Sequence, residues 1–268
     1  MLERFPLALA TFKGGMRDRL LLGLFVISLI LLGTMPIFGS FSMRDVTGAS
    51  TTFSLSVVSA IGILLVLLIG AALIPRDIQS RTIYSIATLP ISRTRYLLEK
   101  YLGLCLLLVC SLGVLGLLNL AGIWFMAASY PPDRPLLWGN YLLYLLFDLE
   151  KLLVLSSVLV LFSAVATSSF LPMVLTLVVY AVGMTTEKVK LFLEMSIGTQ
   201  HASPFLKWVV QTIYYLLPNF SCFDLKQQMI YALPVNPKLL LLTFLYGIGY
   251  SVVMLVLASV AFSRRDFV

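Results

Sequence analysis

The stretch PRDIQSRTIYSIATLPISRTRYLLEK, residues 75–100, is the longest polar interruption in the first half of an otherwise apolar chain. It sets five basic side chains against two acidic ones: Arg76, Arg81, Arg93, Arg95 and Lys100 against Asp77 and Glu99. Long apolar segments flank it on both sides. Basic residues beside membrane spans resist translocation and favour the anionic inner leaflet. The stretch is therefore expected on the cytoplasmic side of a membrane, and it sets the predicted orientation of the chain.

The pattern inside this stretch predicts a short surface helix. Apolar residues at helical spacing run through 83–89 and stop at Pro90. Ser92 is placed to N-cap the next helix, which we expect to enter the membrane near Leu97. The alternative is a plain loop with a solvated run of charges. If the short helix forms, it lies between two spans, where a soluble partner can bind it and move it.

Composition places the chain in the membrane class. Of its 268 residues, 60% are hydrophobic and 12% are charged, whereas a soluble domain carries about 25% charged residues. The net charge of +7 does not indicate nucleic-acid binding, because such proteins cluster their basic residues on a polar surface without spans around them. We therefore predict an all-α integral membrane protein that binds no nucleic acid.

The patterns of several enzyme and metal sites do not occur. No GxxxxGK[ST] sequence is present, so the chain is not expected to bind ATP through a P-loop. The chain has one histidine, His201, and three cysteines, Cys105, Cys110 and Cys222, with neither an HExxH nor a CxxC motif. We therefore expect no cofactor, no metal site and no catalytic residue in this chain.

Hydrophobic runs divide the chain into six predicted spans within a single transmembrane domain, 1–268. The spans are 20–38, 53–74, 101–128, 141–166, 170–185 and 239–262. Residues 1–19 predict an interfacial elbow, and 75–100 form the cytoplasmic loop. The outer segment 187–238 includes 205–217, which is too short to span and predicts a re-entrant or interfacial helix. This topology puts both termini in the cytoplasm, in line with the positive-inside rule.

The fourth predicted span contains charged residues. Asp148, Glu150 and Lys151 interrupt its apolar run, and unpaired charges at the centre of a bilayer cost roughly 3 kcal/mol each. Asp148 and Lys151 are three residues apart, so they can pair on one helix face. One interpretation is an intramembrane polar cluster that faces a translocation path or a dimer seam. The other is that 138–147 lies in the outer interface, which leaves the charges at headgroup depth.

Residues 69–103 resemble the first cytoplasmic loop of ABC-2 type transporter permeases, with its acidic residue, threonine, proline, Ser-Arg pair and following lysine. The matching residues are Asp77, Thr82, Pro90, Ser92, Arg93 and Lys100. Residues 10–32, YYLLPNFSCFDLK at 214–226 and the tail 263–268 are similar to segments of the subgroup linked to multicopper-enzyme (nitrous oxide reductase) maturation. Arg81 departs from the family, where many members have glycine, and residues 87–89 replace a more usual Leu-Leu-Ser.

The resemblance implies a six-span permease subunit of an ATP-binding cassette exporter. It implies two separate ATPase subunits that bind ATP and Mg²⁺, a second permease copy forming a homodimer, membrane lipids around it, and the inner membrane of a prokaryote. The segment 77–89 would act as the coupling element. The implied ATPase-coupling residues are Arg76, Asp77, Ser80, Arg81, Thr82, Ile83, Ile86, Leu89, Pro90, Ser92 and Arg93. A hydrophobic or amphipathic cargo is slightly favoured, since the family cavity would be lined by apolar spans.

Two other functions remain open from the sequence. Asp148, Glu150 and Lys151 fit a proton-coupled carrier or an intramembrane enzyme, which would act without an ATPase and lose activity in Glu150→Gln. The third hypothesis is a structural assembly factor that transports nothing. Co-purification with a Walker-A protein distinguishes the transporter from the carrier or enzyme.

Overall fold

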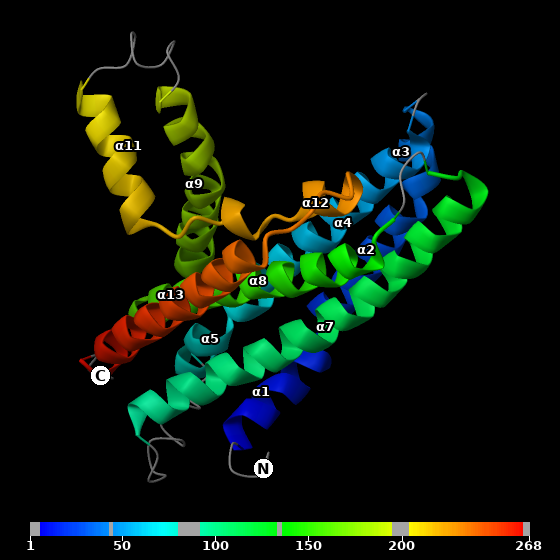
Figure 1. The fold of residues 1–268 in the computed structure, drawn as a ribbon. Helices are drawn as coiled ribbons and strands as arrows, with labels where there is room; N and C mark the ends of the chain where they lie inside the picture. Colours follow the sequence, from blue (N-terminus) through cyan, green and yellow to red (C-terminus); the bar gives the residue numbers. More distant parts are fainter. Residues whose placement is uncertain (1–5, 43–44, 80–91, 133–135, 195–203, 265–268) are drawn as a thin grey trace.

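The computed structural model describes residues 6–42, 45–79, 92–132, 136–194 and 204–264, and within these ranges all regular structure is helical. Most of the long helices run side by side in one bundle (Figure 1). The fold is therefore all-α, as the sequence predicts.

The first half of the chain supplies seven described elements of the bundle. Its elements are α1 (Pro6–Met16), α2 (Arg19–Gly33), α3 (Met35–Ser40), α4 (Val46–Leu65), the π-helical turn η2 (Val66–Gly70), α5 (Leu73–Gln79) and α7 (Arg93–Ser129). Aspartates start two of these helices: Asp18 accepts a hydrogen bond from the Leu20 amide, and Asp45 accepts one from the Gly48 amide at 2.7 Å. Such caps satisfy amides that have no partner inside the helix.

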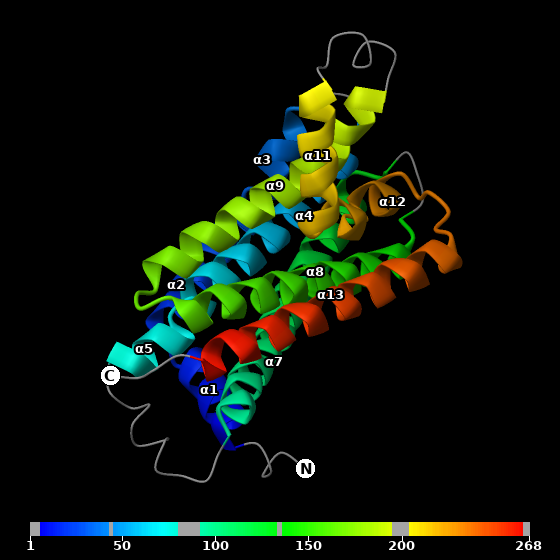
Figure 2. The same cartoon turned by 90° about the vertical axis from the view of Figure 1, so that its left-hand side faces the viewer.

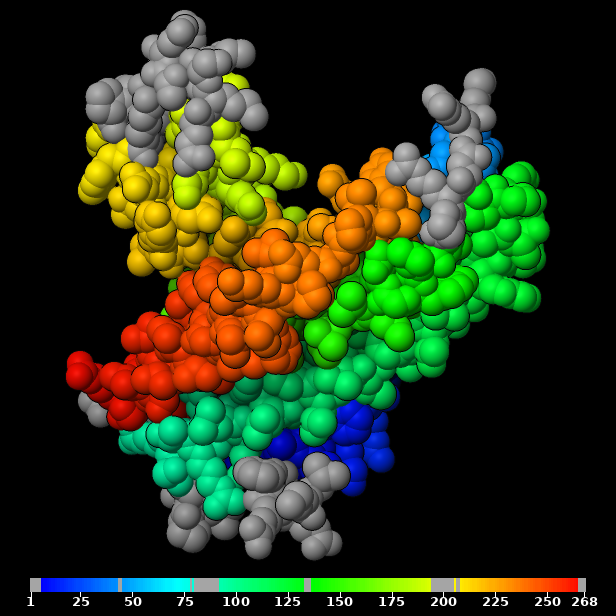
Figure 3. Space-filling view, in the orientation of Figure 1, coloured from blue at the N-terminus to red at the C-terminus, as the bar shows by residue number. Residues whose placement is uncertain are grey.

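The second half adds α8 (Trp138–Val165), α9 (Phe170–Glu194), α11 (Pro204–Leu216), the short turns η3 (Ser221–Phe223) and α12 (Lys226–Ile230), and α13 (Pro237–Ser263). Helix α8 packs along α13 over most of its length, and both views show the two side by side (Figures 1 and 2). Helices α9 and α11 pack against each other, α9 also packs against α8, and α11 projects from the bundle in Figure 1. Helix α13 lies on the face of the molecule shown in Figure 3.

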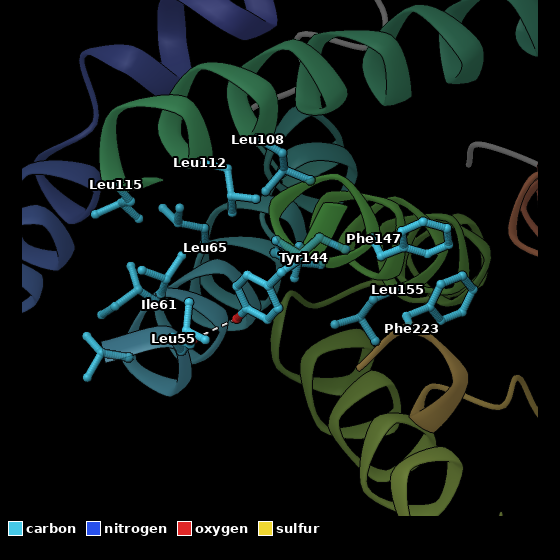
Figure 4. Packing of buried hydrophobic residues seen from close by; sticks show 14 of the residues in the cluster. Leu55, Ile61, Leu65, Leu108, Leu112, Leu115, Tyr144, Phe147, Leu155 and Phe223 are labelled. Carbon is cyan, nitrogen blue, oxygen red and sulfur yellow. Dashed lines mark hydrogen bonds between the residues drawn. The ribbon is translucent and has the colours of Figure 1, made fainter. Parts of the chain in front are cut away.

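The core lies where α4, α7 and α8 meet. Leucines of α7 interlock with Ile61 and Leu65 of α4, while Tyr144 of α8 reaches across and donates a hydrogen bond of 2.7 Å to the Leu55 carbonyl (Figure 4). Glycines permit this close approach: a Cβ on Gly62 would overlap Leu152. Because a buried hydroxyl needs a partner, the Tyr144 contact fixes the register of α8 against α4.

Five helical segments of the described chain are long and apolar enough to cross a membrane. They are Arg19–Ser40, Val46–Asp77, Arg93–Ser129, Phe170–Leu193 and Pro237–Ser263. Helix α8 has 28 residues, also enough to span, but it carries Asp148, Glu150 and Lys151 in its middle. The structure thus shows a multi-pass helical protein, and the sixth span remains a prediction that depends on α8.

Two helices extend beyond the predicted spans. Helix α4 starts at Val46 rather than near Phe53, because Asp45 caps it and serine and threonine hydroxyls bond to carbonyls of the preceding turn. Helix α9 continues to Glu194, nine residues past the predicted end at Thr185. The charged residues of this extension are tolerated since α11 packs beside it, with the Lys190 ammonium 4.1 Å from the centre of the Tyr214 ring.

Candidate functional site

The end of α5 and the start of α7, which precede and follow residues 80–91 in the sequence, are bound to each other. Asp77, near the end of α5, forms an ion pair with Lys100 at 2.7 Å and accepts a hydrogen bond of 2.6 Å from the Tyr96 hydroxyl. Both charged side chains are partly buried, with 18% and 13% of their surface exposed. A charge-assisted bond in this setting is stronger than one on an open surface. The two anchors of the loop are therefore held at one point.

Helix α1 is attached to the same turns of α7. The Glu99 side chain is fully buried; one oxygen accepts from the Arg95 guanidinium at 2.8 Å and the other from the Leu7 amide at 2.9 Å. Leu7 lies in the first turn of α1, where amides lack helical partners and a negative charge is favourable. Gly103 lets α1 approach, because a Cβ there would overlap Thr11. Glu99 therefore caps α1 from another helix.

The last turn of α13 is attached there as well. Arg93 donates a hydrogen bond of 2.9 Å to the Ser263 carbonyl, and the Thr94 and Ser259 hydroxyls lie 3.1 Å apart. The Tyr96 and Phe262 rings stack with centroids 5.8 Å apart. A basic side chain at a helix C-terminus is favourable because the last carbonyls carry partial negative charge. We refer to this assembly, the end of α5, the start of α7, α1 and the end of α13, as the basic end of the bundle.

The described residues include four of the predicted coupling residues. Asp77 and Arg93 make the contacts above; Ser92 N-caps α7 through the Arg95 amide at 3.3 Å, which confirms that predicted cap. Arg76 is 75% exposed and lies 3.7 Å from Asp18. The other predicted residues lie outside the described residues: Ser80, Arg81, Thr82, Ile83, Ile86, Leu89 and Pro90.

Sequence reasoning did not assign roles to Tyr96 and Glu99, which connect α7 to α5 and to α1 at the basic end. A signal for Glu99 was present in the sequence, since it follows Arg95 by four residues and such pairs meet on a helix face. For Tyr96 no comparable local signal exists, because its partners Asp77 and Phe262 come from two other helices.

The three charged residues of α8 separate onto different faces. Lys151 donates to Asp148 at 2.5 Å and to the Ser59 hydroxyl of α4 at 2.6 Å, and both charged side chains are almost completely buried. Glu150 is turned toward α13, where a Cβ on Gly247 would overlap its carboxylate. The structure therefore brings Asp148 and Lys151 together and leaves Glu150 outside that pair. All three lie inside the bundle rather than on its surface.

Glu150 lies in the wall of a cavity of about 390 Å³ between α8 and α13. A second cavity of about 390 Å³ lies on a neighbouring face of the same stretch of α13, where Asn219 and Cys222 pack between α9 and α13. There the side-chain amide of Asn219 donates a hydrogen bond of 3.1 Å to the Glu187 carboxylate. The backbone amide of Asn219 donates one of 2.9 Å to the Tyr246 hydroxyl. Burial raises the pKa of the nearby Cys222 thiol to about 12. This thiol is therefore protonated at neutral pH and is a poor nucleophile.

These observations define a class of protein: a helical protein with several helices long enough to span a membrane, in which the ends of α1, α5, α7 and α13 meet at the basic end. Within the described residues, no three histidine, cysteine, aspartate or glutamate side chains converge as metal ligands would. The family model of the ABC-2 family transporter protein matches residues 6–267, nearly the whole chain. The chain belongs to this family. No curated protein matches it.

Membership in this family identifies the chain as a membrane permease of an ABC transporter. The membrane domains of this family are non-catalytic transport components, and the family implies an ABC ATPase as partner. The match does not favour a proton-coupled carrier or an intramembrane enzyme. It is to the family as a whole and does not distinguish the nitrous oxide reductase maturation subgroup, which stays a prediction.

Proposed function

We propose that the chain is the membrane-spanning subunit of an ATP-driven exporter, and that residues 75–100 transmit the movement of separate ATPase subunits to the membrane helices. The observation that carries this proposal is the Asp77 contact with Lys100 and Tyr96, which joins both ends of the loop. A displacement of the loop would therefore move α5 and α7 together, because their ends are bonded to each other.

The same turns of α7 distribute the movement. Through Glu99 they hold α1, and through Arg93 they hold the end of α13. A displaced loop would thus shift helices from the beginning, the middle and the end of the chain. The ATPase changes the conformation only to the extent that it binds the two states with different affinity. Hydrogen bonds and ion pairs that join several helix ends at one place would carry a displacement of one end to the others.

The proposal includes the topology and the assembly. The basic loop and both termini would lie in the cytoplasm of a prokaryotic cell, with α8 as the sixth span and α1 as an elbow in the interface. Two ATPase subunits, which bind ATP and Mg²⁺, would pair with two copies of this chain. The many exposed apolar side chains of α2, α9 and α13 support contact with lipid or a second copy. The cargo would be hydrophobic or amphipathic.

Co-purification tests the proposal. The chain would be expressed with the ATPase encoded beside it, purified in mild detergent and assayed for ATP hydrolysis and transport. We expect a stable complex, and we expect Asp77→Asn to leave ATP hydrolysis active but to lower transport severalfold, because the loop anchors are loosened. A permease that never associates with the ATPase would contradict the proposal.

A charge exchange and a matched control sharpen this test. Asp77→Lys combined with Lys100→Asp restores an ion pair in reversed orientation, so it should recover part of the lost transport. Asp224→Asn removes a similar aspartate, which lies 3.9 Å from Lys226 away from the basic end, and should leave coupling unchanged. Equal loss of transport in Asp77→Asn and Asp224→Asn would refute a specific role for the basic end.

A further inference from the structure

Glu150 has no hydrogen-bond partner among the described residues, although it is almost completely buried. Its exposed fraction is 5%, and both carboxylate oxygens are shielded from solvent and unpaired within the described part of the chain. Lys151, the next residue, points away because one step along a helix turns a side chain by about 100°, and it is occupied by Asp148 and Ser59. A buried carboxylate without a partner is unfavourable. Glu150 therefore lacks the hydrogen-bond or ion-pair partner that a buried charged residue normally has.

The Glu150 side chain lines the cavity between α8 and α13, and its carboxylate lies against Gly247, which belongs to the same lining. The volume of about 390 Å³ is within the range of small-molecule sites. Most of the lining is apolar, including Leu153, Phe244 and Leu255. Tyr101 also lines it, but its hydroxyl already donates to the Leu153 carbonyl at 3.2 Å. Among the described residues of the lining, Glu150 is the one charged group and Ser251 adds a hydroxyl.

The rim of the cavity is exposed and apolar. Leu146 of α8 and Ile248 and Val252 of α13 line it, and 45–54% of each residue's surface is exposed. In a spanning bundle these residues contact acyl chains rather than water. A ligand would therefore enter from the bilayer, and its body has to be apolar.

We propose that this cavity binds a lipophilic ammonium ion, with its apolar body against α13 and its charged head on the Glu150 carboxylate. A protonated amine supplies three donors and a full positive charge, whereas an acyl chain would leave the carboxylate unpaired and an anion would be repelled. The absence of a side chain at Gly247 makes the room for the carboxylate. This site lies within one copy of the chain and does not depend on the proposed coupling.

Calorimetric titration of the purified permease alone, in mild detergent, tests the site. The probes are 1-naphthylmethylamine, 1-naphthalenemethanol and 1-naphthoate, which share an apolar body and differ in charge; empty micelles provide the baseline. We expect saturable binding of the amine, weaker binding of the alcohol and none of the carboxylate. Equal binding of amine and alcohol, or no saturable binding of the amine, would overturn the proposal.

Variants connect binding to the named residues. Glu150→Gln should weaken binding of the amine roughly tenfold or more, since the charge partner is lost. Gly247→Ala should weaken it too because the added methyl competes with the carboxylate, whereas Gly249→Ala, on the same helix with open space around it, should bind as the original chain does. Thermal unfolding identifies any variant that fails to fold. Undiminished binding in a folded Glu150→Gln or Gly247→Ala protein refutes the assignment. The assay contains no ATPase, so failed coupling cannot affect its outcome.

Discussion

Two Asp–Lys ion pairs with similar nitrogen–oxygen distances lie in different surroundings. Asp77 and Lys100 join two helices at the basic end, 2.7 Å apart and partly open to solvent. Asp148 and Lys151 lie within one helix, 2.5 Å apart and excluded from solvent, with Ser59 as an added partner. A partly buried ion pair costs less to break than one that is fully excluded from solvent. The first pair can therefore hold two helices together and still be rearranged, whereas the second is suited to a fixed structural role.

The largest expected effect comes from breaking the buried pair. Lys151→Met leaves the Asp148 carboxylate uncompensated in the core, which should cost about 3–5 kcal/mol of stability. We expect a large loss of folded protein in size-exclusion chromatography and a lower midpoint of thermal unfolding. The double variant Asp148→Leu, Lys151→Met removes both charges and should recover much of the folded yield. If the single variant is as stable as the original chain, the buried pair has no structural role.

An intermediate effect is expected at Glu99. Glu99→Ala removes the bond to the half-exposed Arg95 and the bond to the Leu7 amide. The first is worth little, and the second, a hydrogen bond to a charged group, contributes roughly 1.5–3 kcal/mol. The loss should be local, so amide hydrogen exchange in α1 should rise while exchange in α4 and α8 stays slow. Glu99→Gln retains an acceptor oxygen for the Leu7 amide and is the matched control. Unchanged exchange in α1 of Glu99→Ala would show that other contacts hold this helix.

Local features of the structure were predictable from the sequence, and long-range ones were not. The all-helical class follows from apolar runs, the Ser92 cap from the residues beside it, and the capacity of Asp148 and Lys151 to pair from their spacing. The bond from Glu99 to Leu7 spans 92 positions and that from Arg93 to Ser263 spans 170, so no periodicity signals them. The burial of Glu150 likewise depends on where α13 packs. Tertiary contacts determine these features.

The extension of α9 past Thr185 is another feature that depends on tertiary contacts and that the sequence did not predict. A charged sequence after Thr185 favours the end of a span, because charges are costly in lipid. The helix continues nonetheless, since Leu193 is buried and Lys190 lies over the Tyr214 ring of α11. The coupling helix predicted at 83–89 lies outside the described residues, so it stays a prediction.

The smallest effect on stability is expected at Arg76, the exposed member of the basic end. Its guanidinium lies 3.7 Å from Asp18 and is 75% exposed, so Arg76→Gln should change the free energy of unfolding by less than about 0.5 kcal/mol. Thermal unfolding of the permease alone measures this. A shift well above that size would mean that the Arg76–Asp18 pair is part of the fold rather than a free surface group.

The same variant then separates folding from partner binding. If Arg76 contacts the ATPase, Arg76→Gln should lower the affinity of the complex by severalfold without changing the stability of the permease, and the loss should shrink at high salt because exposed charges are screened. Lys226→Gln is the matched control, since Lys226 forms a similarly loose pair, 3.9 Å from Asp224, away from the basic end. An equal loss of affinity in both variants would indicate a general effect of net charge. A loss at Arg76 alone would show that the exposed part of the basic end contacts the partner, while the partly buried Asp77–Lys100 pair connects the helices behind it.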